Sequence, residues 1–450
     1  MRGKGILVPD SELDNTKYKL TLIAKKAEAE PKLKFTSQMH LLDEQYLMKC
    51  FKVLKANKAP GVDRRTVESY SKDEIKAAVS QLVEDLKTQK YRPQPVRRVF
   101  IPKANGKQRP LGIPVVMDRI LQRAVANILE PLYEPLFRDC SYGFRPGRSA
   151  HDALKAVNHM VMGQKVNWII DADIKDFFGN VNHTWLMECL KQRINEPNLL
   201  RLIQRFLKAG VMEGGTWERT LKGTPQGGIV SPILANIYLH YVLDLWFELK
   251  EAPQQNGHAQ LVRYADDFVI GAQHRHEAYA MLEDIRQRLA KFGLELSEEK
   301  THILEFGRYA ARNRGNRGQG KPESFDFLGF RHYCSTTRDG RFSLKVETSR
   351  KKFAAAVLSQ KLWFKRVRTQ PIKRIWRTLA SKLQGHYNYY GVSGNFAAVK
   401  YYYRQNRALA FKWLNRRSQK RSWNWEEFQV YLDTHPLPQP KVNYAIYNTW

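Results

Sequence analysis

The 450-residue chain is 43% hydrophobic and 12% aromatic, which excludes a disordered protein and predicts two or three domains. Its 75 Lys and Arg residues against 44 Asp and Glu give a formal net charge of +31, so the expected partner is a polyanion, nucleic acid first. The sequence has no long apolar run, which argues against a membrane partner. Its cysteines show no paired spacing, which argues against a zinc site or a disulfide framework. Its amino terminus lacks a secretory signal, so the cytoplasm is the expected location.

The first part of the chain is expected to be helical around one hairpin. Residues 1–35 are polar, rich in lysine and without a clear period, so they are expected to be loosely held. A helical pattern from 36 to 90 is broken by the turn-forming residues 57–63. Residues 96–103 alternate like a strand, and 109–114 return after a short turn. A further helix is expected over 118–136.

The central part alternates strands with helices. Residues 168–174 read as a buried strand with Asp171 and Asp173 on one face, and residues 261–270 as a hairpin with Asp266 and Asp267 at its tip. Helices are expected at 183–193, 198–208, 230–248 and 276–292, and further strands at 294–305 and 325–330. Residues 307–324 are rich in Gly and Arg and are expected to form a basic loop.

The last 101 residues, from Arg350 onward, have a helical pattern with 20 basic and 3 acidic residues. Strands interleaved with helices, followed by this helical region, predict an α+β core with an α-helical appendage. The sequence shows no internal repeat at a fixed period.

The acids at the two predicted strand ends indicate a possible chemistry. Joining nucleotides requires a deprotonated 3′-hydroxyl and offset phosphate charge, which two Mg²⁺ ions about 4 Å apart can provide. Asp173 and Asp266 are suitable oxygen donors from two rigid elements, although an isolated Asp-Asp pair is also typical of a solvated turn. Together they point to a polymerase of the palm type.

Seven sequence blocks, in order, resemble the reverse transcriptase/maturase proteins encoded by bacterial group II introns. The resemblance extends from about residue 57 to 442. The blocks lie at 101–114, 142–149, 173–178, 223–228, 264–267, 296–300 and 325–330. Each block alone is a weak signal, whereas all of them in order are specific. The family's fold is a right-hand polymerase, with fingers and palm followed by an α-helical thumb and maturase domain.

The resemblance implies roles for the acids, with two Mg²⁺ as cofactors. Asp173 lies five residues before Phe178, as the family's first catalytic aspartate lies before an aromatic residue. Asp266 would be the second shared ligand and Asp267 a weaker ligand or an electrostatic helper. Asp171 lacks the spacing to an aromatic and is expected to have a supporting role.

The resemblance also implies a nucleotide-binding set. Lys103 and Arg109 would hold the triphosphate, and Phe178 would lie under the incoming sugar and exclude a 2′-hydroxyl. Gln226 would pack near the nascent pair, and Lys300 would assist the departure of pyrophosphate. On sequence alone, Lys103 and Arg109 would more often be solvated strand charges. A solvated charge is also the alternative for Lys300, and core packing is the alternative for Phe178.

The chain would then divide into a flexible segment (1–35), fingers with an amino-terminal extension (36–165), a palm with parts of the fingers (166–345) and a thumb/maturase domain (346–450). Cations in the last domain are expected to bind RNA and the template through phosphates, rather than forming only a solvated face. They are Lys351, Lys352, Lys361, Lys365, Arg366, Arg368, Lys373, Arg374, Arg377, Arg416, Arg417, Lys420 and Arg421.

The expected function is an RNA-directed DNA polymerase that binds its parent group II intron RNA, assists splicing and copies the intron during retrohoming. Its partners would be the intron RNA, an RNA template with a DNA primer, target DNA and dNTPs, in a bacterial cytoplasmic ribonucleoprotein. No endonuclease pattern follows the maturase-like region, so the short form is expected. Two alternatives stay open: a splicing maturase with a vestigial polymerase site, and a reverse transcriptase domesticated for defence or linked to an adaptive immune locus of the CRISPR type.

Overall fold

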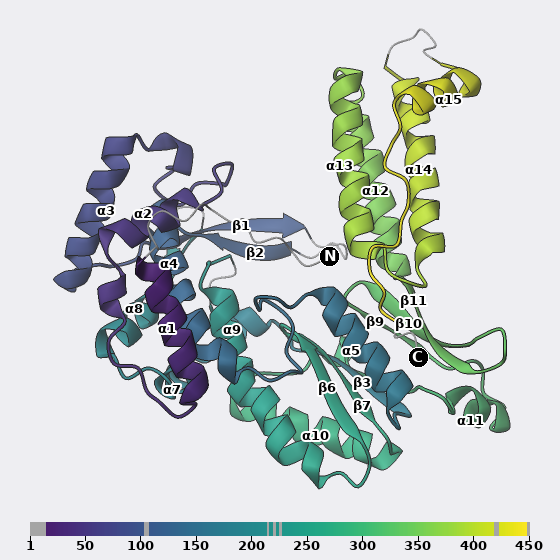
Figure 1. Cartoon of the computed structure of the whole chain (residues 1–450), viewed down its shortest axis with the longest axis horizontal. Coiled ribbons are helices and arrows are strands. Elements are labelled where there is room, and N and C mark those ends of the chain that lie inside the picture. The colour runs from purple at the N-terminus through teal and green to yellow at the C-terminus, as the bar shows by residue number, and fades with distance from the viewer. Residues whose placement is uncertain are drawn as a thin grey trace. The chain divides into compact units, whose positions relative to one another are not determined.

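The computed structural model describes residues 15–102, 108–213, 216–218, 222–224, 227–417 and 423–447 (Figure 1). These residues form a mixed α+β fold, as predicted. They fall into two units, each built from separate stretches of the chain. Unit 1 comprises the described residues within Met1–Gly147, Ile174–Glu251 and Glu283–Ser297, and unit 2 those within Arg148–Asp173, Ala252–Leu282 and Glu298–Trp450. Each unit therefore draws on more than one of the ranges predicted as domains.

Unit 1 is mainly helical. Its helices are α1 (Asn15–Ala29), α2 (Glu44–Lys52), α3 (Lys72–Lys87), α4 (Val116–Tyr133), α6 (Phe177–Asn180), α7 (His183–Lys191), α8 (Pro197–Leu207) and α9 (Ser231–Leu239). Single 3₁₀ turns occur at Met39–Leu41, Val67–Ser69 and Glu134–Leu136. The helix expected over 230–248 is α9 followed by π-helical turns at His240–Asp244 and Phe247–Glu251. Helix α10 (Arg275–Lys291) is shared between the two units.

One sheet belongs to unit 1, in the order β2-β1-β4-β5. Its strands are β1 (Val96–Pro102), β2 (Gln108–Ile113), β4 (Val211–Glu213) and β5 (Thr216–Glu218). The antiparallel β1–β2 pair is the hairpin predicted from alternation, with Arg97 opposite Ile113 and Ile101 opposite Arg109. The expected turn at residues 104–107 lies outside the described residues.

Helix α1 forms within the segment that was expected to be loosely held. The cause is Arg193, whose side chain is almost fully buried and donates hydrogen bonds to the backbone oxygens of Ala27, Glu30 and Leu33, each at 2.9 Å. The guanidinium thus supplies donors to carbonyl oxygens at and just beyond the end of α1, where the helical N–H donors run out. A backbone bridge between Phe35 and Ile194 continues the attachment. The sequence pattern did not indicate this helix or its attachment to Arg193.

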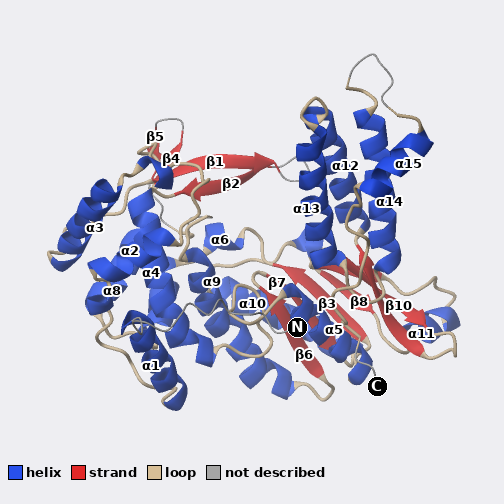
Figure 2. Ribbon diagram, turned by 45° about the horizontal axis from the view of Figure 1, so that its top comes forward, coloured by secondary structure: helices blue, strands red, loops and turns tan. Residues whose placement is uncertain are grey.

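The central sheet of unit 2 has the order β6-β7-β3-β8, with every neighbouring pair antiparallel (Figure 2). Its strands are β3 (Trp168–Asp173), β6 (Ala259–Tyr264), β7 (Asp267–Ala272) and β8 (His302–Glu305). Helix α5 (Ala150–Gly163) packs on β6 and β7. A Cβ at Gly271 would lie 2.8 Å from the sulfur of Met160, so the helix can approach β7 closely because residue 271 is glycine.

A second sheet of unit 2 has the order β11-β10-β9, with strands β9 (Ser324–Phe327), β10 (Phe330–Thr336) and β11 (Phe342–Thr348). The strand expected over 294–305 is shorter, because the 3₁₀ turn Glu298–Lys300 precedes β8; another 3₁₀ turn occupies Ala252–Gln254. The predicted basic loop contains a short helix, α11 (Ala310–Asn316), and Arg317 just after it forms an ion pair with the buried carboxylate of Glu305.

The carboxyl-terminal part of unit 2 is helical, as predicted. It comprises α12 (Arg350–Val367), α13 (Ile372–Tyr390), α14 (Phe396–Leu414) and α15 (Trp425–Thr434). The helices share a core in which Phe364, Leu379, Leu383 and Phe428 are fully buried. In the described part of the chain, every helix is too short or too polar to cross a bilayer.

His332 on β10 gives a prediction about stability. Its ring is fully buried and stacks on Phe325 at 4.8 Å, and neither ring nitrogen has a hydrogen-bond partner among the described residues. Burial lowers the pKa of His332 to about 3. Because this value lies below that of the unfolded chain, protonation favours unfolding, and stability should fall as the pH drops from about 6.5 towards 3. We expect His332→Phe to unfold at a higher temperature than the native chain, by a margin that grows from pH 7.5 to pH 4.5. A margin independent of pH, measured by thermal melts, would contradict this account.

Candidate active site

Three carboxylates project from one face at one end of the central sheet of unit 2. In the antiparallel β3–β7 pair, Asp173 lies directly opposite Asp267. Residues opposite each other in such a pair point to the same face of the sheet, and so do residues two apart on one strand. Asp171 therefore shares the face of Asp173 and Asp267. Asp266 adds a fourth carboxylate from the two-residue connection between β6 and β7.

A buried arginine holds the two-residue connection that carries Asp266. Ala265 has a φ of +58°, a left-handed conformation that is unfavourable for a residue with a Cβ. The side chain of Arg263 is fully buried, and its guanidinium donates a hydrogen bond of 2.9 Å to the backbone oxygen of Ala265. Such local strain persists only where the surroundings impose it, and here it holds the acidic tip in one conformation.

A cavity of about 790 Å³ lies beside these acids. Asp171, Asp173 and Asp267 line it, whereas Asp266 is half-buried beside it in the chain and is not part of the lining. Further lining residues come from the 3₁₀ turn before β8, from β8 and β9, from the β9–β10 connection and from the helical region. They include Lys300, His302, Asp326, Leu328, Gly329, Ser349, Lys351, Lys352, Tyr389 and Tyr390. The cavity thus joins the predicted acids to cations and tyrosines from α12 and α13.

The electrostatics of this cavity favour a cation. Burial, together with Asp171, Asp173 and Asp266, raises the pKa of Asp267 well above its usual range, and Lys300 opposes that shift. Burial, followed by Asp326 and Asp173, raises the pKa of Asp171 to about 7. Lys300 places its Nζ 2.7 Å from Oδ2 of Asp173. The ion pair between Lys300 and Asp173 therefore offsets part of the repulsion among the carboxylates.

The residues present fit a magnesium site that is completed by the substrate. Among the described residues, no three His, Cys, Asp or Glu side chains form a ready metal-binding group. Mg²⁺ commonly takes only one or two protein carboxylates, and phosphate oxygens and water supply the rest of its shell. Asp173 and the Asp266–Asp267 pair can supply that number of oxygens from two rigid elements.

A second strained turn forms part of the cavity wall. Leu328 and Gly329 connect β9 to β10 with φ values of +52° and +80°, and left-handed leucine is rare because of its bulky side chain. The hydroxyl of Tyr389 donates a hydrogen bond of 2.8 Å to the Leu328 oxygen, and the Ser349 N–H donates one of 3.0 Å to the Gly329 oxygen. His151 Nε2 lies 2.8 Å from the backbone oxygen of Tyr389. The end of α13 thereby fixes this turn.

The other predicted nucleotide-binding residues are only partly described. Arg109 is exposed on β2 of unit 1. Phe178 is half-buried in α6 of the same unit, with its ring centroid 5.3 Å from that of Phe177. Lys103 and Gln226 lie outside the described residues. The structure therefore brings together Asp173, Asp267 and Lys300, and leaves the rest of this set as a prediction.

The predicted RNA-binding cations that the structure describes divide into three groups. Lys351 and Lys352 line the cavity. Others are exposed to solvent: Lys361, Lys365, Arg366, Lys373, Arg374, Arg377 and Arg416. Arg368 donates to the Lys365 oxygen at 3.2 Å and Arg417 to the Gln370 oxygen at 2.8 Å, so these two also stabilise the helices. Lys420 and Arg421 lie outside the described residues.

Sequence reasoning missed Arg263, Leu328 and Tyr389. The Leu-Gly pair between two apolar runs was a hairpin signal, but it was included in one predicted strand over 325–330. Arg263 lies within the predicted hairpin and had no assigned role, which its burial and its hydrogen bond to the Ala265 oxygen now indicate. Tyr389 lies 61 residues from the carbonyl it binds, so no local pattern could predict the contact.

Acids at the ends of neighbouring antiparallel strands, beside a cavity in a strongly basic α+β protein, are typical of nucleic-acid polymerases, and we assign the chain to this class. Residues 101–332 match the family model described as "Reverse transcriptase (RNA-dependent DNA polymerase)". The group II intron-encoded protein LtrA of Lactococcus lactis subsp. cremoris is 32% identical over 420 residues, covering 77% of this chain and 68% of the relative. Protein YkfC of Escherichia coli (strain K12) is 30% identical over 377 residues, covering 76% and 95%.

The chain belongs to the reverse transcriptase family, in its group II intron-encoded branch. A shorter similarity, 30% identity over 95 residues, links 21% of the chain with 13% of nuclear intron maturase 1 of Arabidopsis thaliana, a mitochondrial protein. The resemblance inferred from the seven sequence blocks is thus confirmed.

Proposed function

We propose that this protein is an RNA-directed DNA polymerase that also binds a group II intron RNA, assists its splicing and copies it during retrohoming. The observation that carries the polymerase function is the placing of Asp173 opposite Asp267, at the wall of an open cavity and next to the turn that bears Asp266. In this proposal the central sheet of unit 2 is the palm, the β1–β2 hairpin belongs to the fingers, and α12–α15 form the thumb and maturase region.

The proposed chemistry uses the acids as oxygen ligands. Asp173 and Asp266 would hold Mg²⁺, which when bound promotes ionisation of the primer hydroxyl and offsets charge on the triphosphate. Asp267 adds negative potential that draws cations to the site. Lys103 and Arg109 would bind the triphosphate, and Phe178 and Gln226 would define the position of the incoming nucleotide. These roles follow from family membership and residue type.

Lys300 gives a prediction that separates two of its possible effects. Because its ammonium group pairs with Asp173 at 2.7 Å, it competes with a metal for that carboxylate and can also neutralise departing pyrophosphate. We expect Lys300→Met to lower kcat for primer extension about tenfold, and also to lower the Mg²⁺ concentration that gives half-maximal activity. A magnesium titration of both proteins is the measurement. An unchanged magnesium midpoint would show that the ion pair does not compete.

Tyr389 gives a prediction about the cavity wall. Tyr389→Phe removes the hydrogen bond to the Leu328 oxygen while keeping the ring, so the strained turn loses one of its two described hydrogen bonds. We expect kcat for primer extension to fall about tenfold, with little change in melting temperature. Tyr401→Phe is the matched control, since Tyr401 is half-exposed on α14 and does not line the cavity. Equal kinetics of the two variants would remove this role from Tyr389.

The cationic surfaces support the RNA-binding part of the proposal. Exposed lysines and arginines of α12 and α13 can contact phosphates without sequence preference. Within unit 1, a cavity of about 470 Å³ is lined by Lys55, Lys58, Arg119 and Arg123, with apolar residues such as Leu111 and Ile113 between them. Such a mixture of cations and apolar surface suits a nucleic-acid strand.

Two assays test the proposed function. The purified protein should extend a DNA primer on an RNA template in a magnesium-dependent manner, and should accelerate splicing of the intron that surrounds its coding sequence. Splicing assistance without primer extension would instead support an RNA-binding maturase with an inactive polymerase site. Primer extension without any effect on splicing would support a reverse transcriptase that does not act as a maturase.

A further inference from the structure

Phe144 is exposed in a backbone conformation that disfavours it. It lies in the loop 141–147 of unit 1, has a φ of +57°, and exposes 52% of its surface. A positive φ is unusual for any residue with a Cβ and is an outlier for one as bulky as phenylalanine. An exposed aromatic ring adds nothing to the core. For folding alone, glycine would suit position 144 better.

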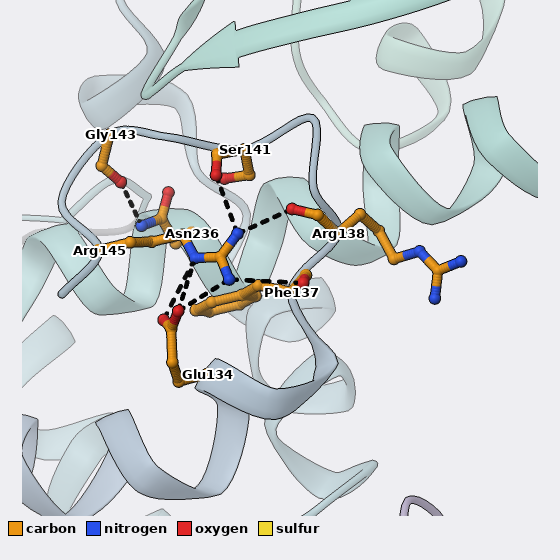
Figure 3. Close-up of polar contacts among 7 residues, drawn as sticks. All are labelled: Glu134, Phe137, Arg138, Ser141, Gly143, Arg145 and Asn236. Atoms are coloured by element: carbon orange, nitrogen blue, oxygen red, sulfur yellow. Dashed lines mark hydrogen bonds and ion pairs between the residues drawn. The ribbon is translucent and has the colours of Figure 1, made fainter. Parts of the chain in front are cut away.

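Buried polar side chains hold the two chain neighbours of Phe144, Gly143 and Arg145 (Figure 3). Next to it, the guanidinium of Arg145 donates to the backbone oxygens of Arg138 at 2.7 Å and Ser141 at 2.8 Å, and it pairs with the Glu134 carboxylate at 2.7 Å. On the other side, Asn236 Nδ2 donates to the Gly143 oxygen at 2.7 Å. The loop is thus fixed by charge-assisted and buried hydrogen bonds, and Phe144 cannot relax without breaking them.

Strain that is maintained in this way points to a use outside the fold. We propose that Phe144 is a stacking site for an unpaired base of a single-stranded RNA. Exposed aromatic rings bind unpaired bases by their faces, and the chain's charge of +31 attracts the phosphates that accompany those bases. This proposal rests on the proposed function for its choice of ligand. It adds a binding residue outside the predicted cations and outside the acidic cavity.

Three substitutions separate stacking from structure. Phe144→Leu keeps a bulky residue at the strained position but removes the aromatic face. Phe144→Trp keeps an aromatic face. Phe144→Gly removes both the ring and the strain. Binding is measured with a fluorescently labelled 20-nucleotide oligouridine, by anisotropy at constant salt, and thermal melts are recorded for each protein.

We expect Phe144→Leu and Phe144→Gly each to weaken RNA binding about tenfold, the size expected for one lost base–aromatic stack, and Phe144→Trp to bind as the native chain does. Phe144→Gly should melt at a higher temperature than the native protein while binding less well. In a second measurement, 5-iodouridine in the same oligonucleotide should form a photochemical cross-link to residue 144, identified by mass spectrometry.

Native-like binding by Phe144→Leu, or cross-links to other residues with none at 144, would overturn the proposal. Primer extension by the native protein is measured in parallel. A protein that cross-links at Phe144 but does not extend a primer would support the stacking site and contradict the polymerase function, so the two failures are distinguishable.

Discussion

Asp173→Asn and Asp266→Asn should each reduce primer extension by about 10³-fold or more, while the variants fold normally. A carboxylate that binds a catalytic metal stabilises the transition state by several kcal/mol, and each 1.4 kcal/mol or so corresponds to a factor of ten in rate. Asparagine has the same shape as aspartate but lacks the charge, so the β3–β7 pairing should persist. The measurement is single-turnover extension at saturating Mg²⁺, with melting temperature recorded alongside.

Asp267→Asn should have a smaller effect on the rate, because Asp267 is proposed to assist rather than to hold the metal alone. The raised pKa of Asp267 means that its ionised form is unfavourable in the fold, so this variant should also melt at a higher temperature. Asp339→Asn serves as the control, since Asp339 is an exposed acid that pairs with Arg341 at the β10–β11 turn. Full activity of Asp266→Asn, or a greater loss in Asp267→Asn, would reverse the roles assigned to the two neighbours.

Arg145→Leu should destabilise unit 1 by about 3–5 kcal/mol, the usual result of removing one partner from a buried ion pair. Only 3% of the Arg145 side chain is exposed, and the substitution would remove one donor from the Glu134 carboxylate and one from each of the backbone oxygens of Arg138 and Ser141 (Figure 3). Urea denaturation followed by circular dichroism measures the change in the free energy of unfolding.

Two further variants calibrate the Arg145 result. Glu134→Gln retains hydrogen-bonding atoms and should cost only about 1–3 kcal/mol. Lys191→Leu removes an exposed ion pair with Glu188 in the same unit and should change stability by less than about 1 kcal/mol. A similar loss of unfolding free energy in Arg145→Leu and Lys191→Leu would mean that the hydrogen bonds and ion pair of Arg145 do not hold the loop 141–147.

The sequence was sufficient to predict the α+β class and the convergence of the acids. Strands have a period of two, and a short hairpin puts its acids at a fixed place, so local patterns could place Asp173 near a strand end and Asp266 and Asp267 at a hairpin tip. The expectation that these acids meet came from the chemistry of joining nucleotides and from the family resemblance, because no local pattern indicates which strands are neighbours. The register adds a detail that the patterns lacked: Asp267, rather than Asp266, lies directly opposite Asp173.

Features that depend on distant partners could not be predicted in this way. The docking of α1 depends on Arg193, more than 160 residues from the carbonyl oxygens it binds at the helix end. Similarly, the block at 142–149 contributed to the family resemblance without any assigned role. The structure shows that Arg145 in this block holds the loop 141–147 by hydrogen bonds to backbone oxygens. Hydrogen bonds between segments remote in sequence have no periodic signature, so only the folded chain reveals them.

The metal site itself can be tested by iron-directed cleavage of the protein bound to an RNA template and DNA primer. Fe²⁺ in place of Mg²⁺, with ascorbate and peroxide, generates hydroxyl radicals that cut the backbone near the metal. Our account predicts cuts within residues 171–173 and 264–267, which excess Mg²⁺ suppresses. Cuts confined to other parts of the chain, or cuts at these positions that Mg²⁺ does not suppress, would contradict the assignment of these aspartates as the magnesium ligands.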